Sequence, residues 1–124
     1  MPKTKNMEWF NGIEKHHIIY KSQGGLDFEL NYKYLTSEEH RGINGPHRNK
    51  ETDLKYKKEL QKKLEKILTK DYYNIKELID LLGLKEKQAN RAFRKLLKVN
   101  GIDRESVIRR LMGGKLYWGD EMDL

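Results

Sequence analysis

The spacing of apolar residues changes once along this chain, and that change limits the folds it can adopt. Between Leu26 and Tyr34 every second residue is apolar or aromatic, which is the period of a strand with one buried face. From Asp53 onward, apolar residues recur at intervals of three and four, which is the period of amphipathic helices. We therefore expect an α+β fold in which a small N-terminal sheet precedes a mainly helical C-terminal part.

The composition favours a thin core and a polyanionic partner. Hydrophobic residues make up 36% of the 124 positions and charged residues another 36%, so a metal or a bound partner is expected to help hold the structure together. The formal net charge of +7 favours nucleic acid as that partner. No apolar run is long enough for a membrane span or a signal peptide, so we expect a soluble, cytoplasmic protein.

The absence of cysteine narrows the possible metal chemistry. Without thiols the chain forms neither disulfides nor thiolate zinc sites, so any metal must be held by His, Asn, Asp or Glu. All four histidines lie in the first 52 residues, which carry a net charge of +1, whereas residues 53–124 carry +6. We expect an N-terminal module over 1–52, a basic connecting helix over 53–70 and a C-terminal module over 71–124.

The first module is expected to contain a two-stranded hairpin. The run around Ile18 leads into the Gly24-Gly25 breaker pair, and the alternating segment that follows supplies a second strand. The side chains expected to pack this module are Trp9, Phe10, Ile18, Phe28 and Tyr34.

A short helix should follow the hairpin. Thr36 and Glu39 have the spacing of a capping box, so a helix begins there and carries His40 in its first turns. Pro46 cannot continue that helix, which places His47 on the loop beyond it.

The C-terminal module has the pattern of a helix-turn-helix. A capping box at Asn74 and Glu77 begins one helix, Gly83 ends it, and a second helix is expected over 85–98. The second helix should bury Ala89, Phe93 and Leu96 or Leu97. The side chains expected to face outward, toward a DNA major groove, are Lys87, Gln88, Asn90, Arg91, Arg94 and Lys95. A last helix, capped by Asp103, should bury Val107, Ile108 and Leu111.

The most specific feature is the order of histidines and asparagines. His16-His17 is followed by Asn31 fourteen residues later and by His40 nine residues after that. Asn44 and His47 lie four and seven positions beyond His40. Phosphodiester hydrolysis needs a base for water and an electrophile for the developing charge, and neutral imidazoles can serve as base and as metal ligands.

Residues 14–50 resemble the HNH endonuclease family, also called ββα-metal or His-Me finger nucleases. The resemblance implies that His17 is the general base, that His16 and His40 bind a divalent ion, and that Asn31 braces the loop which positions the base. The expected ion is Mg²⁺ or Mn²⁺, with Zn²⁺ as a further possibility. Asn44 and His47 are competing candidates for the last ligand. Thr36 and Glu39 stand where many relatives carry a Cys pair, so no structural zinc is implied.

The combined prediction is a metal-dependent DNA endonuclease whose C-terminal helices hold double-stranded DNA. Arg41 and Arg48 are expected to contact phosphates, on charge and proximity. The pairing of a weakly selective cutter with a separate reader resembles phage-type and homing endonucleases, which would act in a bacterial host. The oligomeric state is left open, with a monomer as the simplest assumption.

Several other interpretations stay open from the sequence. The histidines could be solvated surface residues, and the 85–98 helix could be ordinary scaffold. The chain could also be a non-enzymatic, metal-stabilised DNA-binding regulator with a degenerate nuclease fold. An RNA-directed nuclease is a third alternative, disfavoured because a helix-turn-helix fits the B-form major groove better than the deep groove of an RNA duplex.

Overall fold

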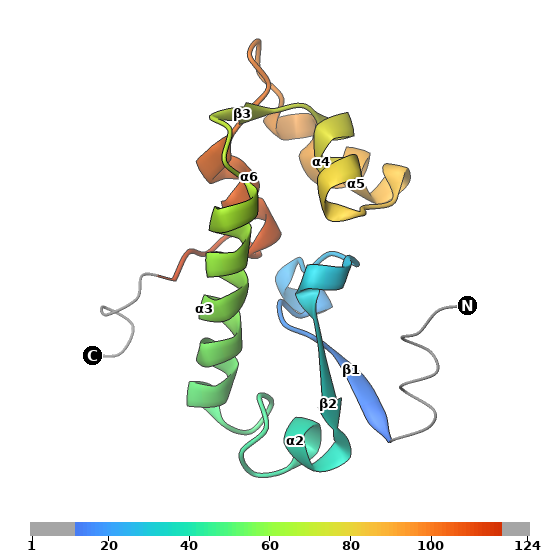
Figure 1. Cartoon of the computed structure of the whole chain (residues 1–124), viewed down its shortest axis with the longest axis vertical. Helices are drawn as coiled ribbons and strands as arrows, with labels where there is room; N and C mark the ends of the chain where they lie inside the picture. The colour runs from blue at the N-terminus through green and yellow to red at the C-terminus, as the bar shows by residue number, and fades with distance from the viewer. Residues whose placement is uncertain (1–11, 118–124) are drawn as a thin grey trace.

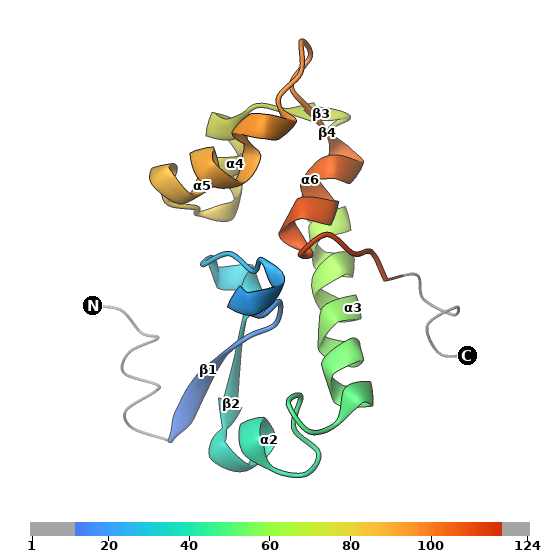
Figure 2. The same ribbon diagram turned by 180° about the vertical axis from the view of Figure 1, so that it is seen from behind.

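The computed structural model describes residues 12–117 and has the expected mixed α+β character. A long helix, α3 (Lys50–Ile67), runs along the molecule, with a small sheet and a short helix beside its first half and a group of short helices around its last turns (Figures 1 and 2). Trp9, Phe10 and Trp118 lie outside the described residues, so the packing expected of Trp9 and Phe10 stays a prediction.

The predicted hairpin is confirmed. Strand β1 (Ile13–His17) pairs antiparallel with β2 (Tyr32–Thr36), with His17 opposite Tyr32. Helix α2 (Ser37–Arg41) follows directly, and the Thr36 side chain accepts a hydrogen bond from the Glu39 backbone while the Glu39 side chain accepts one from the Thr36 backbone. The local capping signal therefore placed this helix correctly.

The alternating pattern predicted one continuous strand after Gly25, but the structure shows an interrupted segment. Two 3₁₀ turns, Lys21–Gln23 and Glu29–Asn31, interrupt the connection, and the second ends just before β2 begins. Phe28 reaches the core, but within β2 the buried side chain is Leu35 while Tyr34 is only half-buried. The Glu29–Asn31 turn buries the polar side chain of Asn31. The side chains that face inward after this turn are therefore not the ones that the alternation predicted.

Helix α3 begins three residues earlier than expected and ends three residues earlier. Asn49 caps it by accepting a hydrogen bond from the Thr52 backbone at 3.1 Å, so the first turn lies before Asp53. Leu60 and Leu64 of this helix are buried. Two polar side chains on the same helix, Lys57 and Gln61, are also buried.

The C-terminal part contains three helices and a two-residue strand pair. The elements are β3 (Tyr72–Tyr73), α4 (Ile75–Leu82), α5 (Glu86–Phe93), β4 (Ile102–Asp103) and α6 (Arg104–Leu111). The caps at Asn74 and Asp103 are confirmed, and Gly83 ends α4 in the left-handed conformation.

Two features of this part differ from the prediction. Helix α5 ends at Phe93, and residues Arg94–Leu96 form a 3₁₀ turn, so the predicted 85–98 helix was too long. The short pairing of β3 with β4 was not predicted at all. It depends on Gly101, because a Cβ there would lie 2.8 Å from the Tyr73 carbonyl oxygen.

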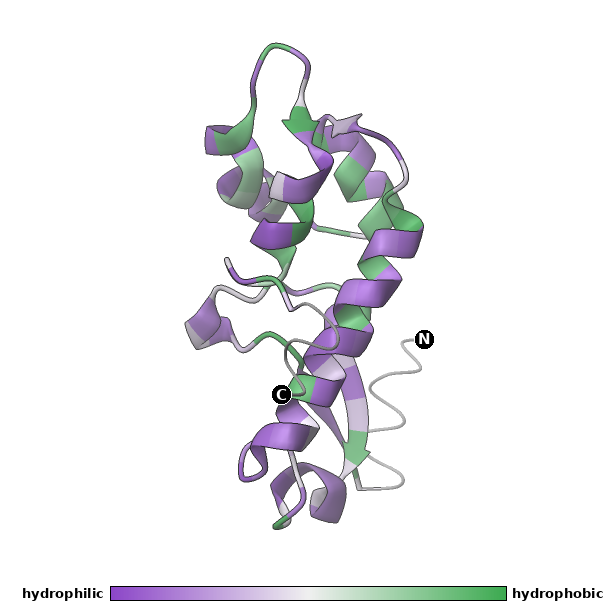
Figure 3. Cartoon of the chain, turned by 90° about the vertical axis from the view of Figure 1, so that its left-hand side faces the viewer, coloured by the Kyte–Doolittle hydropathy of each residue, from purple (hydrophilic) through white to green (hydrophobic). Residues whose placement is uncertain are grey.

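One hydrophobic core connects both ends of the chain. Ile18 and Ile19, after β1, belong to the same cluster as Leu64 of α3 and Leu111 of α6. Figure 3 shows the contrast between this core region and α2, which is hydrophilic throughout. The end that carries the histidines therefore has little apolar packing of its own. None of the helices within residues 12–117 has the length and apolar character required to cross a bilayer.

Candidate metal centre

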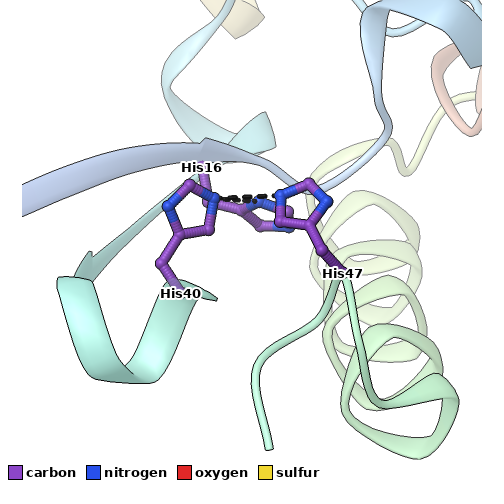
Figure 4. A group of neighbouring side chains, drawn as sticks. All are labelled: His16, His40 and His47. Atoms are coloured by element: carbon purple, nitrogen blue, oxygen red, sulfur yellow. Dashed lines mark hydrogen bonds between the residues drawn. The ribbon is translucent and has the colours of Figure 1, made fainter. Parts of the chain in front are cut away.

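Three imidazole rings from separate elements meet at one point. His16 comes from β1, His40 from α2, and His47 from the loop that leads to α3 (Figure 4). The His40 Nε2 atom lies 3.2 Å from His16 Nδ1 and 3.0 Å from His47 Nε2. One nitrogen from each ring lies within 4.8 Å of the other two.

The local chain geometry explains why His47 turns back toward α2. Gly45 packs against the end of that helix so closely that a Cβ would lie 2.4 Å from the His40 carbonyl oxygen. The Gly45 amide donates to the Gly42 carbonyl at 2.9 Å, which closes the turn. Only glycine allows this approach, and the turn brings His47 beside His40.

Glu14 fixes the orientation of the His40 ring. Its Oε1 lies 2.7 Å from His40 Nδ1, and because a carboxylate only accepts, that nitrogen must carry the proton. The lone pair of Nε2 then faces the other two histidines. Arg41 pairs with the same carboxylate, and the Arg41 and His40 hydrogen bonds lower the pKa of Glu14 to about 2. Glu14 is thus ionised at neutral pH, as a partner that supports a metal-bound histidine should be.

The cluster is buried on one side and open on the other. His16 is 2% exposed, and burial, followed by the charges of His40 and His47, lowers its pKa to about 4. His47 is exposed, although partial burial lowers its pKa as well. Both rings are therefore neutral at physiological pH, which is the state that binds metals. The second nitrogen of His16, Nε2, is buried without a hydrogen-bond partner among residues 12–117.

A polar network lies behind the histidines. The Tyr20 ring packs 5.1 Å from the His47 ring, and its hydroxyl donates to Asp53 at 2.9 Å. Lys57, 3% exposed, donates to the other oxygen of Asp53 at 2.8 Å. Burial and the Asp53 hydrogen bond raise the pKa of Tyr20, so it stays a neutral donor. This network supports the back of the cluster.

The donor set fits a divalent metal ion. A tetrahedral ion bound at about 2.0–2.1 Å by imidazole holds its nitrogens about 3.3 Å apart, and the two spacings from His40 Nε2, 3.2 and 3.0 Å, are close to that value. Three protein nitrogens leave room for water or substrate, which is typical of catalytic rather than structural sites. The identity of the ion does not follow from these distances.

His17 does not join the other three histidines. Adjacent strand residues point to opposite faces, and the His17 Nε2 atom lies 2.7 Å from Asp27 Oδ1 instead. Its ring also meets the edge of Tyr32 at 5.1 Å. His17 therefore lies outside the cluster formed by the other three histidines. His17 lies at the end of β1, bound to its own carboxylate.

Asn31 braces the loop after β1, as expected. Its side chain is fully buried, and its oxygen accepts from the Ile19 amide at 2.8 Å. Its amide nitrogen donates to the carbonyl oxygens of Ile19 at 3.1 Å and of Leu26 at 2.9 Å. The side chain thus replaces strand hydrogen bonds where the hairpin widens into a loop.

The competing ligand and phosphate candidates are now placed. His47 supplies the third imidazole, whereas Asn44 is exposed and its backbone carbonyl accepts a hydrogen bond from Thr52. Arg41 is bound to Glu14, and Arg48 is exposed. In the sequence, Arg41 directly follows His40 and Arg48 directly follows His47.

The predicted reading face of α5 is only partly as expected. Glu86, Lys87, Asn90, Arg91 and Arg94 line a shallow hollow on the surface. Arg94 and Lys95 are exposed but lie in the 3₁₀ turn after α5. The expectation that Gln88 faces outward is wrong, because its amide is half-buried and bonded to the Asp27 backbone.

Sequence reasoning missed Glu14, Tyr20, Asp27 and Asp53. Glu14 had a signal, since it lies two residues before His16 on the same strand and so shares its face. Asp27 had no such signal in the sequence, because the fold of the loop brings it to His17.

Comparisons with protein-family models, with curated proteins and with solved structures find no match to this chain.

Proposed function

We propose that this chain is a metal-dependent DNA endonuclease in which His16, His40 and His47 hold a divalent ion and His17 is the general base. The observation that supports the proposal most is the convergence of three imidazoles with one side exposed. Asp27 supports the role of His17, because a base needs an oriented ring.

The division of roles follows from the side chains. A bound divalent ion would supply Lewis-acid stabilisation of the charge that develops on the phosphate and the departing oxygen. His17 holds a proton on Nε2 against Asp27, so Nδ1 is the nitrogen that takes the proton from the attacking water. Arg48 contributes positive charge for the flanking phosphates.

The all-nitrogen donor set also ranks the candidate ions. Mg²⁺ prefers oxygen ligands, whereas Zn²⁺ binds well to imidazole and Mn²⁺ tolerates it better than Mg²⁺ does. We therefore propose Zn²⁺ or Mn²⁺ ahead of Mg²⁺. The most active of these ions should be the one that makes a bound water the best nucleophile.

Double-stranded DNA is the proposed substrate. The exposed cations of α5, Lys87 and Arg91, flank Asn90 on a helix that follows a tight turn after α4. An exposed helix face of this kind fits the major groove of B-form DNA, and its positive charge supplies affinity for phosphates.

The test is nicking of supercoiled plasmid with Zn²⁺, Mn²⁺ or Mg²⁺ by the wild type and by His17→Ala and His40→Ala. We expect His40→Ala to lose metal binding, and His17→Ala to keep metal binding while nicking about 10²- to 10⁴-fold more slowly. Lys76→Ala, an exposed cation on α4 paired with Asp80, is the control and should behave as wild type. Matched RNA tests the choice of substrate.

Each outcome has a clear interpretation. If His17→Ala nicks at the wild-type rate, His17 is not the base. If the wild type binds both metal and DNA but nicks with none of the ions, the non-enzymatic DNA-binding alternative replaces the endonuclease.

A further inference from the structure

We propose that Gln88 on α5 positions His17 through Asp27, so that the helix facing the DNA also sets the orientation of the candidate base. This inference rests on the proposed function for its catalytic consequence. Its structural content, a chain of hydrogen bonds from α5 to the His17 ring, can be tested without any nuclease activity.

The first link joins Asp27 to His17. The Asp27 carboxylate accepts from His17 Nε2 at 2.7 Å, which selects the tautomer with the proton on Nε2 and leaves the lone pair on Nδ1. This hydrogen bond is the largest cause of the lowered pKa of Asp27, so the carboxylate is charged. The Tyr32 ring, in a T-shaped contact with the imidazole at 5.1 Å between centroids, also limits its rotation.

The second link joins Asp27 to Gln88, which is 61 residues away in the chain. The Gln88 Oε1 atom accepts from the Asp27 amide at 2.7 Å, and Gln88 Nε2 donates to the Asp27 carbonyl at 3.2 Å. The amide thus satisfies both backbone groups of Asp27, as a neighbouring strand would. The Asp27 side chain is 42% exposed, so burial alone does not hold this residue in place.

The same loop is held at a second point by the C-terminal helices. Arg110 of α6 donates to the Gly24 carbonyl at 2.9 Å. A Cβ on Gly113, just after α6, would lie 2.6 Å from the Gln23 carbonyl, so the backbones are in close contact. Together with Gln88, these contacts make the loop before Asp27 dependent on how α5 and α6 are docked.

The position of Gln88 on α5 links the exposed, positively charged side of this helix to the orientation of Asp27. The neighbouring Lys87 and the following Arg91 are exposed, whereas Ala89 and Phe93 are fully buried in the core. A polyanion bound to Lys87 and Arg91 would therefore contact the same helix that holds Asp27 through Gln88. The interaction that recognises DNA and the interaction that orients the base share one eight-residue helix.

The decisive experiment measures the tautomer of His17 by long-range ¹H–¹⁵N NMR on the full chain labelled with ¹⁵N-histidine, at about pH 8, where an ordinary histidine is neutral. The His17 signals are identified by their loss in His17→Gln. We expect the wild type to hold the proton on Nε2. Gln88→Met, which keeps the side-chain length but removes both hydrogen bonds, should shift the ring toward a mixture of tautomers.

Further variants separate this effect from unfolding. Asp27→Ala should shift the tautomer as Gln88→Met does, whereas Asp27→Asn keeps an accepting oxygen and should retain the wild-type tautomer. Lys87→Met, next to Gln88 but exposed, is the matched control and should leave the His17 signals unchanged. Each variant is first shown to be folded by its backbone spectrum.

Kinetics supply the functional readout. In plasmid nicking, Gln88→Met should lower kcat roughly 10- to 100-fold with little change in KM, because a misdirected ring affects the chemical step. Lys87→Met should instead raise KM. A His17 proton on Nδ1 in the wild type, or an unchanged tautomer in Gln88→Met, would overturn the proposal. If the tautomer shifts but no variant nicks DNA, the coupling stands and the endonuclease function fails.

Discussion

Glu14 offers the sharpest test of the metal centre, because it touches a candidate ligand but is not itself in the cluster. Its carboxylate keeps the proton of His40 on Nδ1, so that Nε2 presents a lone pair to the other histidines. In Glu14→Ala the ring is free to rotate and to change tautomer. We expect metal affinity to fall, although all three imidazoles remain.

The size of the effect follows from two relations. Loss of a partner behind a metal-bound histidine costs about 10- to 100-fold in affinity. An ion present at 100 times its Kd stabilises the wild type by about 2.7 kcal/mol, or roughly 10 °C in Tm for a chain of this size. At the same ion concentration, a tenfold loss reduces that shift to about one half, and a hundredfold loss to about one seventh.

The assay is thermal unfolding with and without Zn²⁺, together with calorimetric titration of the ion. Arg41→Ala is the matched control, since it removes the ion pair of Glu14 but leaves the hydrogen bond to His40. It should keep most of the metal-induced shift. Equal Zn²⁺ affinities in Glu14→Ala and Arg41→Ala would show that Glu14 does not orient a ligand.

Three further predictions concern stability. Asn31→Ala should lower the free energy of unfolding in urea by about 3–5 kcal/mol, because three buried backbone groups lose their partner, whereas the exposed Asn90→Ala should change it by less than about 0.5 kcal/mol. A smaller loss in Asn31→Ala, comparable with that control, would contradict the bracing role. In metal-free protein, the lowered pKa of His16, about 4, means that protonation favours the unfolded chain. Stability should be complete above about pH 6.5 and fall by up to about 3 kcal/mol as the pH drops toward 4, and His16→Gln should flatten that profile. Gly45→Ala should destabilise by about 1–3 kcal/mol and weaken Zn²⁺ binding by displacing the loop that carries His47; unchanged affinity would show that the tight turn is unnecessary.

Local signals in the sequence predicted local structure well. The capping boxes at Thr36 and Asn74 and the cap at Asp103 place three helix starts at the right residues. Each depends on contacts within four residues, so no knowledge of the fold is required. The end of α5 was predicted less well, because no glycine or proline marks the change from α-helix to the 3₁₀ turn after Phe93.

The candidate site was predictable in its ligands but not in its partners. The family resemblance named His16 and His40 as ligands and left Asn44 and His47 as alternatives for the last one. The structure brings His47 to the other two imidazoles. The two-residue period of a strand also shows that His17 points away from His16. The contact of Gln88 with Asp27 depends on how distant helices dock, and no pattern in either segment indicates it.

The shared core limits how this protein could be re-engineered. Ile19 after β1 and Leu111 of α6 belong to one apolar cluster, so the histidine-bearing end and the C-terminal helices are not interchangeable cassettes. A designer who replaced α4, α5 and α6 would remove part of the apolar packing next to β1, the strand that carries His16. A graft would have to reproduce the buried faces of those helices and the amide at Gln88, leaving only the solvent-facing positions free to vary.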